Sequence, residues 1–192
     1  MTDLATFVLL GVVAYVAGSL NFSILAFRFS GRQDPRHHGS GNPGATNVYR
    51  QAGIGWAVAV LLLDVGRAVL VALAAKTVLP FWQVPWVGLV LIIGNRFPCF
   101  HAFKGGKGVA NYLGFTAVTA PPWAVLGTLA WGAAHLAWRT PFLSSFAMVF
   151  FLAMGTTLAG ESWRGGVGTV VTALFIVACH HRNIRERWGR QG

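Results

Sequence analysis

Two short polar segments of the sequence carry residue types that bind phosphate. Residues 39–50 read Gly-Ser-Gly-Asn-Pro-Gly-Ala-Thr-Asn-Val-Tyr-Arg, and residues 104–108 read Lys-Gly-Gly-Lys-Gly. Glycines allow a backbone to turn N–H groups toward an anion, and Ser, Thr, Asn, Arg and Lys side chains add hydrogen-bond donors and positive charge. Because both segments lie in an otherwise largely apolar chain, they predict a phosphate-handling site at a membrane surface.

The first segment is dense in donor side chains. They are Ser40, Asn42, Thr46, Asn47 and Arg50. A short helix starting near Pro43 would direct its N–H groups at an anion. The spacing Gly39-x-Gly41-x-x-Gly44 matches a dinucleotide fingerprint, but that fingerprint must follow a buried strand, and residues 32–38 are too polar to form one. We therefore favour an anion-binding loop, with a flexible connecting loop as the alternative.

The second segment resembles a P-loop only superficially. Gly108 stands where a P-loop has the Ser or Thr that binds magnesium, and no glycine lies five residues before Lys107. A basic loop bound to lipid headgroups is the alternative interpretation, but such a loop would not require three glycines. Close approach of the backbone at Gly105 and Gly106 to a phosphate explains them better, with Lys104 and Lys107 supplying charge.

A third polar cluster ends the last apolar run of the chain. His180 and Asn183 are three residues apart, so on a helix they share one face. No carboxylate or cysteine cluster accompanies them, and we therefore expect no metal site. A polar helix end flanked by basic residues is the alternative interpretation.

Composition places the chain among membrane proteins. Of its 192 residues 55% are hydrophobic and 10% are charged, against about 25% charged in soluble domains. The net charge of +10 does not form one basic stripe, because Lys and Arg punctuate the apolar runs. We therefore expect anionic lipids and anionic substrates as partners, no nucleic acid, and one domain over residues 1–192. No basic region precedes the first run, so no cleaved signal peptide is expected.

The apolar runs predict an all-α polytopic membrane bundle. Six runs are evident, at residues 4–27, 54–79, 84–98, 109–138, 142–160 and 166–180. Pro121-Pro122 divides the fourth run into helices over 109–120 and 123–138, which gives seven transmembrane helices. Asp64 and Arg67, three residues apart within the second run, are expected to form an interior ion pair.

The distribution of Lys and Arg decides the number of spans and their orientation. With seven spans and the N-terminus outside, twelve of these residues fall in inner loops and two in outer loops, whereas six spans give eight and six. The sequence therefore predicts an outside N-terminus and a cytoplasmic C-terminus. Both glycine-rich segments and the tail cluster would then meet on the cytoplasmic face.

Together these motifs resemble the bacterial integral-membrane acyl-phosphate:glycerol-3-phosphate acyltransferases, the PlsY family. The first family motif is matched by residues 39–50. The second is matched at Gly94, Phe97, Pro98 and 104–110, and the third at His180, Asn183 and Ile184. Asn95, where the family usually has His, and Arg182, where it usually has Glu, depart from the pattern and would bear on substrate preference.

The resemblance implies the first step of phospholipid biosynthesis at the bacterial plasma (inner) membrane. An acyl chain would move from acyl phosphate to the 1-hydroxyl of glycerol 3-phosphate, releasing lysophosphatidic acid and phosphate. The implied catalytic residues, which would hold glycerol 3-phosphate, are Ser40, Arg50, Lys107, His180 and Asn183. The implied substrate-binding residues are Gly41, Asn42, Gly44, Thr46, Asn47, Lys104, Gly105, Gly106 and Gly108. The backbone around Gly41, Asn42, Gly44, Thr46, Gly105 and Gly106 would cradle the acyl phosphate. Neither a cofactor nor a metal is implied, and a monomer is expected.

The residue types suit this chemistry. Acyl phosphate is already activated, so the protein needs only to position two phosphates and offset their repulsion. A phosphate oxygen would accept the hydroxyl proton, with His180 as the competing general base. Acyl-CoA or an acyl-carrier protein stays open as the donor. A small anion transporter and a non-catalytic diverged paralogue are the alternative functions; the crowding of polar residues at one face disfavours transport.

Overall fold

Long apolar runs, punctuated by Pro, Gly and Asn, produce a structure built of helices. The computed structural model describes residues 4–160 and 162–189, and all regular secondary structure in those ranges is helical, which confirms the all-α prediction. The α-helices are α1 (Leu4–Ser19), α2 (Phe22–Phe29), α3 (Ala45–Ala52), α4 (Ile54–Val78), α5 (Val84–Arg96), α6 (Val109–Thr119), α7 (Pro121–Trp138), α8 (Pro141–Ala159), α9 (Trp163–Ala178) and α10 (His181–Trp188). The short 3-10 helices are η1 (Pro35–His37), η2 (Phe81–Gln83) and η3 (Cys99–His101).

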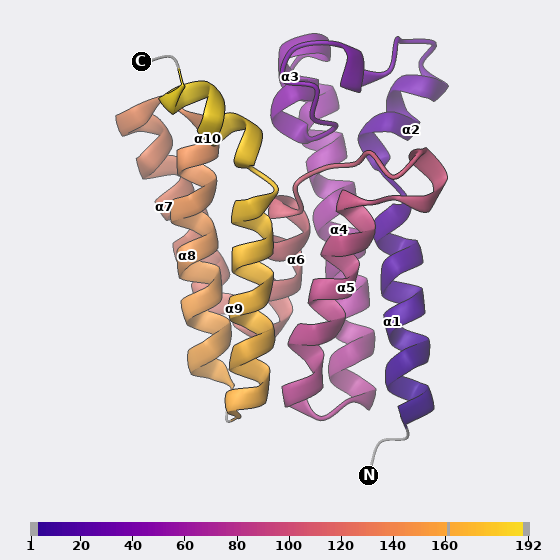
Figure 1. The fold of residues 1–192 in the computed structure, drawn as a ribbon, viewed down its shortest axis with the longest axis vertical. Helices are drawn as coiled ribbons and strands as arrows, with labels where there is room; N and C mark the ends of the chain where they lie inside the picture. The colour runs from indigo at the N-terminus through magenta and orange to yellow at the C-terminus, as the bar shows by residue number, and fades with distance from the viewer. Residues whose placement is uncertain (1–3, 161, 190–192) are drawn as a thin grey trace.

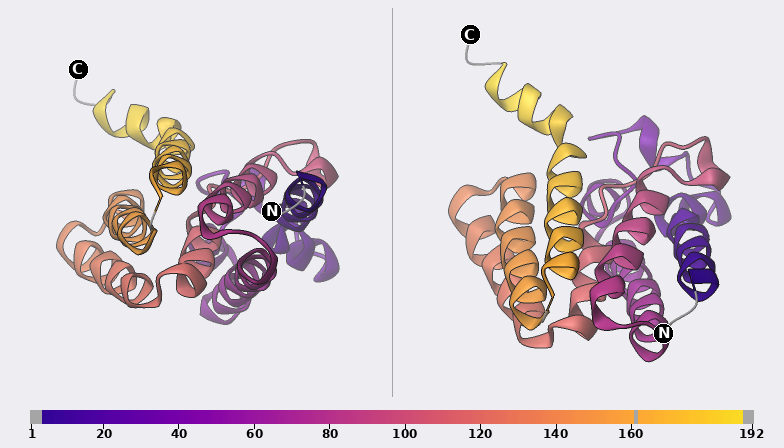
Figure 2. Two further views of the ribbon diagram at one scale, coloured as in Figure 1. Left: turned by 90° about the horizontal axis from the view of Figure 1, so that it is seen from below. Right: turned by 60° about the horizontal axis from the view of Figure 1, so that its bottom comes forward.

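The long helices run along one axis of the molecule, and the polar segments gather at one end of it. Helices α1 and α4 to α9 follow the long axis in Figure 1, while α2, α3, α10 and the segments 30–44 and 97–108 lie at the end where the chain finishes. Figure 2 shows the same arrangement from two further directions. We call this the loop end.

Length and apolar composition allow several of these helices to cross a membrane. Within the described ranges, α4 and α8 each meet that condition alone. Two bent pairs meet it jointly: α1 with α2, bent by 41°, and α9 with α10, bent by 48°. Helices α5 and α6 have 13 and 11 residues, shorter than the roughly 20 of an independent span. They pack inside the bundle against α1, α4 and α9.

The predicted single span over residues 4–27 was wrong in one respect, because the helix breaks near its end. Helix α1 stops at Ser19 and α2 starts at Phe22 in a new direction. The Asn21 side chain caps α2, its Oδ1 accepting a hydrogen bond from the Ile24 N–H at 3.2 Å. One capping asparagine ends a helix locally even where the surrounding residues are apolar.

A buried arginine satisfies the carbonyl groups that this break leaves open. The Arg67 guanidinium donates to the carbonyl oxygens of Ala17 at 3.0 Å and Gly18 at 3.3 Å, and also to that of Leu20. Where no water reaches, unpaired carbonyls at a helix end are costly. Arg67 on α4 therefore makes the bend between α1 and α2 stable inside the bundle.

The same guanidinium joins three helices. It pairs with Asp64 at 2.8 Å, which confirms the predicted interior ion pair, and donates to Asn111 Oδ1 on α6 at 2.6 Å. The Phe22 ring lies 5.0 Å from the guanidinium carbon. Asp64, Arg67 and Asn111 are all buried. The sequence predicted the ion pair, but it did not indicate the hydrogen bonds from Arg67 to Asn111 and to the carbonyl groups at the end of α1.

The break at the double proline was also predicted correctly, although its boundaries differ. Helix α6 ends at Thr119 and α7 starts at Pro121, so the prolines form the first turn of α7 and do not separate the two helices. Proline suits that position because the first N–H groups of a helix need no helical partner. Pro141 begins α8 in the same way, where the sequence placed the start at residue 142.

Small residues allow close contact between helices. A methyl group placed on Gly18 would lie 2.2 Å from the Leu91 carbonyl oxygen, and one on Gly94 would lie 2.3 Å from that of Tyr15. Helices α1 and α5 therefore meet backbone to backbone, as helices in membranes often do. Gly114 gives the same close approach between α6 and α4. These contacts fix α5, whose C-terminus supports the lysine-containing loop.

We predict that Arg67→Met strongly destabilises the bundle. The substitution leaves the Asp64 carboxylate and several carbonyl groups buried without a partner, at a cost of about 3–5 kcal/mol. Thermal unfolding in mild detergent should show a large fall in Tm for this variant and a smaller fall for Asp64→Asn/Arg67→Met, which removes both charges. Lys76→Met, in the last turn of α4 where the side chain is exposed, is the control. Equal Tm values for Arg67→Met and this control would contradict the prediction.

Candidate functional site

The segment 39–44, which we call the glycine loop, is organised around one inward-pointing asparagine. Asn47 Nδ2 donates to the carbonyl oxygens of Pro35 at 2.9 Å and His38 at 3.1 Å, while its Oδ1 accepts from the Ser40 N–H at 3.2 Å. Gly39 has φ of +63°, and a methyl group there would lie 2.4 Å from Asn47 Oδ1. The buried Asn47 side chain is thus occupied within the loop, where the sequence predicted a substrate contact.

Helix α3 follows the glycine loop and begins at Ala45, two residues after the predicted start. Gly44 is its N-cap, and no side chain caps its first turn. The uncapped N–H groups of a first turn attract anions. Thr46 in that turn and Arg50 near the helix end are exposed. Among the described residues the Arg50 guanidinium makes no ion pair, so it is available to a ligand.

The segment 104–108, which we call the lysine loop, lies on the C-terminus of α5. The Gly105 N–H donates to the Arg96 carbonyl oxygen at 3.0 Å, and the Gly106 N–H to that of Asn95 at 2.9 Å. A methyl group on Gly105 would lie 2.0 Å from the Asn95 carbonyl oxygen. Both glycines are therefore needed for close packing, and both N–H groups already have partners, whereas the sequence predicted that they face a phosphate.

Lys107 projects from this loop toward the start of α10. Its Nζ donates to Asn183 Oδ1. Burial, and secondarily the positive charge of Arg96, lowers the pKa of Lys107 from 10.5 to about 8. The ammonium group is therefore mainly protonated at neutral pH, but holds its proton less firmly than an exposed lysine does.

The three sequence motifs meet at the loop end, as predicted. Lys107 and Asn183 join the lysine loop to α10. A methyl group on Gly106 would lie 3.5 Å from the Pro43 carbonyl oxygen, which places the lysine loop against the glycine loop. A methyl group on Gly41 would lie 3.4 Å from Arg182 Nη1, which places α10 against the glycine loop as well.

His180 lies just before α10 and is held in one orientation. Its Nδ1 is 2.8 Å from the Ile176 carbonyl oxygen, and its ring meets that of Phe146 edge-on, with centroids 5.2 Å apart. A carbonyl oxygen only accepts hydrogen bonds, so Nδ1 carries the proton and Nε2 is left as an acceptor. The sequence indicated His180 but not Phe146 of α8, because a phenylalanine in an apolar run carries no signal of its own.

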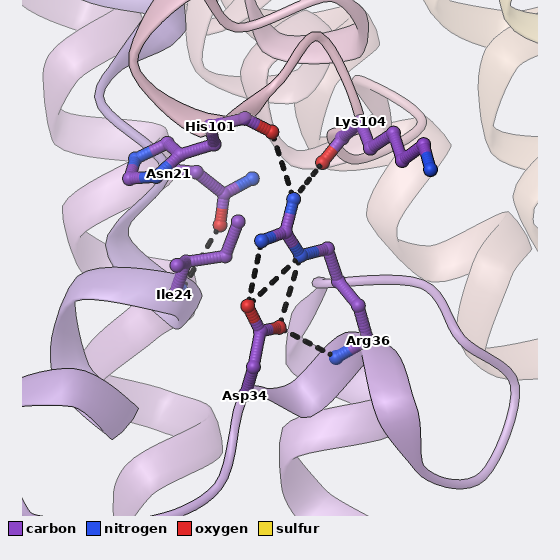
Figure 3. A network of polar contacts seen from close by, with 6 residues as sticks. All are labelled: Asn21, Ile24, Asp34, Arg36, His101 and Lys104. Atoms are coloured by element: carbon purple, nitrogen blue, oxygen red, sulfur yellow. Dashed lines mark hydrogen bonds and ion pairs between the residues drawn. The ribbon is translucent and has the colours of Figure 1, made fainter.

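Arg36 also contributes to the site and was not predicted from the sequence. It binds both carboxylate oxygens of Asp34 and donates through Nη1 to the carbonyl oxygens of His101 at 2.8 Å and Lys104 at 2.9 Å (Figure 3). These contacts lower the pKa of Asp34, chiefly through the hydrogen bond from the Arg36 side chain. Arg36 thereby ties the segment before the glycine loop to the segment before Lys107.

The assembled site is cationic and suits phosphate chemistry. Lys107, Arg96 and Arg182 interact electrostatically where the loops meet, and Arg50 is exposed on α3, the helix that follows the glycine loop. Within residues 4–160 and 162–189, no group of three or more His, Cys, Asp and Glu side chains is arranged to hold a metal ion. The arrangement therefore offers positive charge, backbone N–H groups and one histidine acceptor to its ligands.

Comparisons with known proteins identify relatives over almost the entire chain. The sequence model of the glycerol-3-phosphate acyltransferase family matches residues 8–189. The chain is 40% identical over 183 residues to the glycerol-3-phosphate acyltransferase of Pseudomonas paraeruginosa, covering 93% of this chain and 94% of that protein. It is 39% identical over 184 residues to that of Pseudomonas fluorescens, covering 94% and 95%.

Two solved structures share the fold. Both are crystal structures of PlsY (YgiH), an integral membrane glycerol 3-phosphate acyltransferase. The glycerol 3-phosphate form has a TM-score of 0.89 and 33% identity, and the lysophosphatidic acid form has 0.87 and 32%. Each comparison covers 96% of this chain and 93% of the other. The fold described here is thus that of an integral membrane protein.

We predict that Asn47→Ala loosens the glycine loop. The loss of buried hydrogen bonds costs about 1–3 kcal/mol, so hydrogen exchange at the amides of Ser40 and Gly41 should accelerate about tenfold or more. Gln51→Ala is a matched control, because Gln51 donates to the same Pro35 and His38 carbonyls from an outer position. Equal exchange rates in the two variants would show that Asn47 does not organise the loop.

Proposed function

The chain belongs to the glycerol-3-phosphate acyltransferase family, and on that premise we propose that acyl phosphate is its donor and the 1-hydroxyl of glycerol 3-phosphate its acceptor. Lysophosphatidic acid and inorganic phosphate would be the products. The observation that carries the proposal is the pairing of Lys107 with Asn183 where the glycine loop, the lysine loop and α10 meet. An acyl phosphate needs no further activation, and this site supplies the charge and positioning that its transfer requires.

Glycerol 3-phosphate would be held by five side chains around this meeting point. They are Ser40, Arg50, Lys107, His180 and Asn183. Lys107 would supply a partly buried point charge, and Arg50 a planar guanidinium that can bind two phosphate oxygens. Asn183, already in contact with Lys107, would exchange that hydrogen bond for one to the substrate. The buried His180 would present Nε2 toward the glycerol hydroxyls.

The acyl phosphate would lie against the glycine loop and the first turn of α3. Gly41, Asn42 and Gly44 lead into that turn, and Thr46 stands in it. The uncapped N–H groups favour an anion there. Gly105, Gly106 and Gly108 would contribute mainly by lacking side chains, since the first two already use their N–H groups on α5. Lys104, exposed on the outer side, would add charge.

The reaction would then follow from proximity and charge. The glycerol 1-oxygen attacks the acyl carbonyl carbon, a new ester bond forms, and the bond from that carbon to the phosphate oxygen breaks. Lys107 offsets the negative charge that develops during this step. The hydroxyl proton passes to an oxygen of a substrate phosphate; His180 Nε2, a free acceptor, is the competing base.

The membrane arrangement supports the same proposal. We infer seven membrane-spanning helices, an outside N-terminus and a cytoplasmic loop end in the plasma membrane of a bacterium, with the protein acting as a monomer. Support comes from the alternation of helix directions along the chain in Figure 1 and from the concentration of Lys and Arg at the loop end. A site at that end would meet soluble glycerol 3-phosphate and leave the acyl chains of donor and product in the bilayer.

The donor assignment predicts a specific activity. Purified protein with palmitoyl phosphate and glycerol 3-phosphate should release phosphate and form lysophosphatidic acid, detected by mass. Lys107→Met should lower kcat by about 100-fold or more, because charge stabilisation by one preorganised donor is of that size. Lys76→Met, which removes an exposed lysine far from the site, should retain activity. Turnover with acyl-CoA but not with acyl phosphate would contradict the proposed donor and would leave the family assignment unchanged.

The pKa of Lys107 predicts how glycerol 3-phosphate binding depends on pH. The substrate phosphate is a dianion above about pH 7, since its second pKa is about 6. Lys107 loses its proton as pH rises through about 8, so the dissociation constant should rise between pH 8 and 9, by up to about tenfold. Calorimetry at pH 7, 8 and 9 should show this rise, and Lys107→Arg should abolish it. A dissociation constant that is the same at pH 7 and pH 9 would contradict the role given to Lys107.

A further inference from the structure

A cavity at the loop end plays no part in the proposed reaction. Its volume is about 560 Å³, and Ile24 and Arg28 of α2 belong to its lining. Helices α2 and α10 lie on opposite sides of the loop end in Figure 1. The polar and aromatic groups in its lining are Arg28, Arg32, Asp34, Arg36, Phe100 and His101. Positive charges therefore outnumber negative ones in a space large enough for a phosphate-bearing headgroup.

Two of the three arginines in this lining are available to a ligand. Arg36 is fully used by Asp34 and by two backbone carbonyls, as Figure 3 shows. Arg28 and Arg32, by contrast, form no salt bridge within the described part of the chain. The Arg32 guanidinium lies over the Trp56 ring, 5.9 Å from its centroid, which limits its movement while leaving donors open. Two unpaired guanidinium groups in one lining suit the oxygens of a phosphate.

A histidine in the same lining has an unused polar atom. His101 Nε2 is buried and has no hydrogen-bond partner among the described residues. Burial, and then the charge of Arg36, lowers the pKa of His101, so the ring is neutral at pH 7. Because Nε2 is shielded from solvent, it is closed to a ligand in the cavity, and His101 serves as a neutral part of the lining.

Exposed aromatic residues lie in the cavity lining and next to it in the sequence. Phe100 in the lining is 56% exposed, and Phe103 and Phe29, which follow the lining residues Ala102 and Arg28, are 58% and 85% exposed. Ala102 and Phe103 have positive φ, and Arg36 holds the carbonyls on either side of them. The strained turn therefore presents its aromatic rings outward. Exposed aromatic rings beside arginines are typical of the boundary between lipid tails and headgroups.

We propose that this cavity binds the phosphate group of an anionic phospholipid. Arg28 and Arg32 would bind the phosphate oxygens, and the acyl chains would lie along the exposed aromatic rings of Phe29, Phe100 and Phe103. The site is distinct from the proposed reaction site, because none of the residues proposed to hold the substrates lies in its lining. A bound headgroup would anchor the 97–104 segment, whose next residues form the lysine loop.

Native mass spectrometry of the full chain in mild detergent tests the proposal. Titration with phosphatidylglycerol should show a saturable adduct, and phosphatidylcholine should bind more weakly. Arg28→Gln/Arg32→Gln should weaken phosphatidylglycerol binding by at least about tenfold without affecting phosphatidylcholine. Arg185→Gln/Arg187→Gln removes the same charge from exposed positions of α10 and should bind phosphatidylglycerol like the wild type. Wild-type affinity in the first variant, or an equal loss in both, would overturn the proposal.

Two further measurements identify the source of the phosphate and keep the test decisive. Displacement of phosphatidylglycerol by millimolar inorganic phosphate would overturn the assignment to a lipid and indicate a soluble phosphate; failure to displace it supports the lipid. Phe100→Ser removes an aromatic ring but no charge, and should weaken lipid binding while leaving acyl transfer intact. Unchanged lipid binding in Phe100→Ser would overturn the lipid assignment even if the arginine variant failed to fold.

Discussion

The arrangement of the molecule depends on the buried guanidinium group of Arg67. Helix α1 ends against its neighbours at buried Gly18 and Ser19, where its last carbonyl groups are largely shielded from solvent and need partners. Arg67 satisfies them, Asp64 neutralises its charge, and Asn111 links the group to α6. Because α2 leads to the glycine loop and α6 begins at the end of the lysine loop, one junction sets the relative positions of these two loops.

Polar side chains hold the candidate site together through hydrogen bonds within and between its loops. Asn47 closes the glycine loop from within, and Arg36 ties that loop's lead-in to the segment before Lys107. Asn95 supports the lysine loop from the end of α5. With these groups in place, Lys107 and Asn183 meet across the loop end. Such preorganisation is what a transfer reaction between two anions requires.

Residue types and periodicity were enough to predict the helical class, the break at Pro121-Pro122, the Asp64–Arg67 pair and the meeting of three motifs. They missed the break at Asn21, because one capping residue is hidden within an apolar run. They also missed Asn111 and Arg36, whose partners lie 44 and 65–68 residues away in the chain. The inward direction of Asn47 could not be predicted from composition either. A loop rich in hydrogen-bond donors does not reveal which of them bond to its own backbone and which are available to a ligand.

The central claim is that Lys107 and Asn183 act on one phosphate. A double-mutant cycle on glycerol 3-phosphate affinity tests it most directly, using Lys107→Met, Asn183→Ala and the double variant, measured by calorimetry in detergent. The account predicts that the double variant loses less binding free energy than the two single variants lose together. The difference, which is the coupling energy, should be about 1 kcal/mol or more. Additive losses, within about 0.3 kcal/mol, would show two independent residues and contradict a shared site.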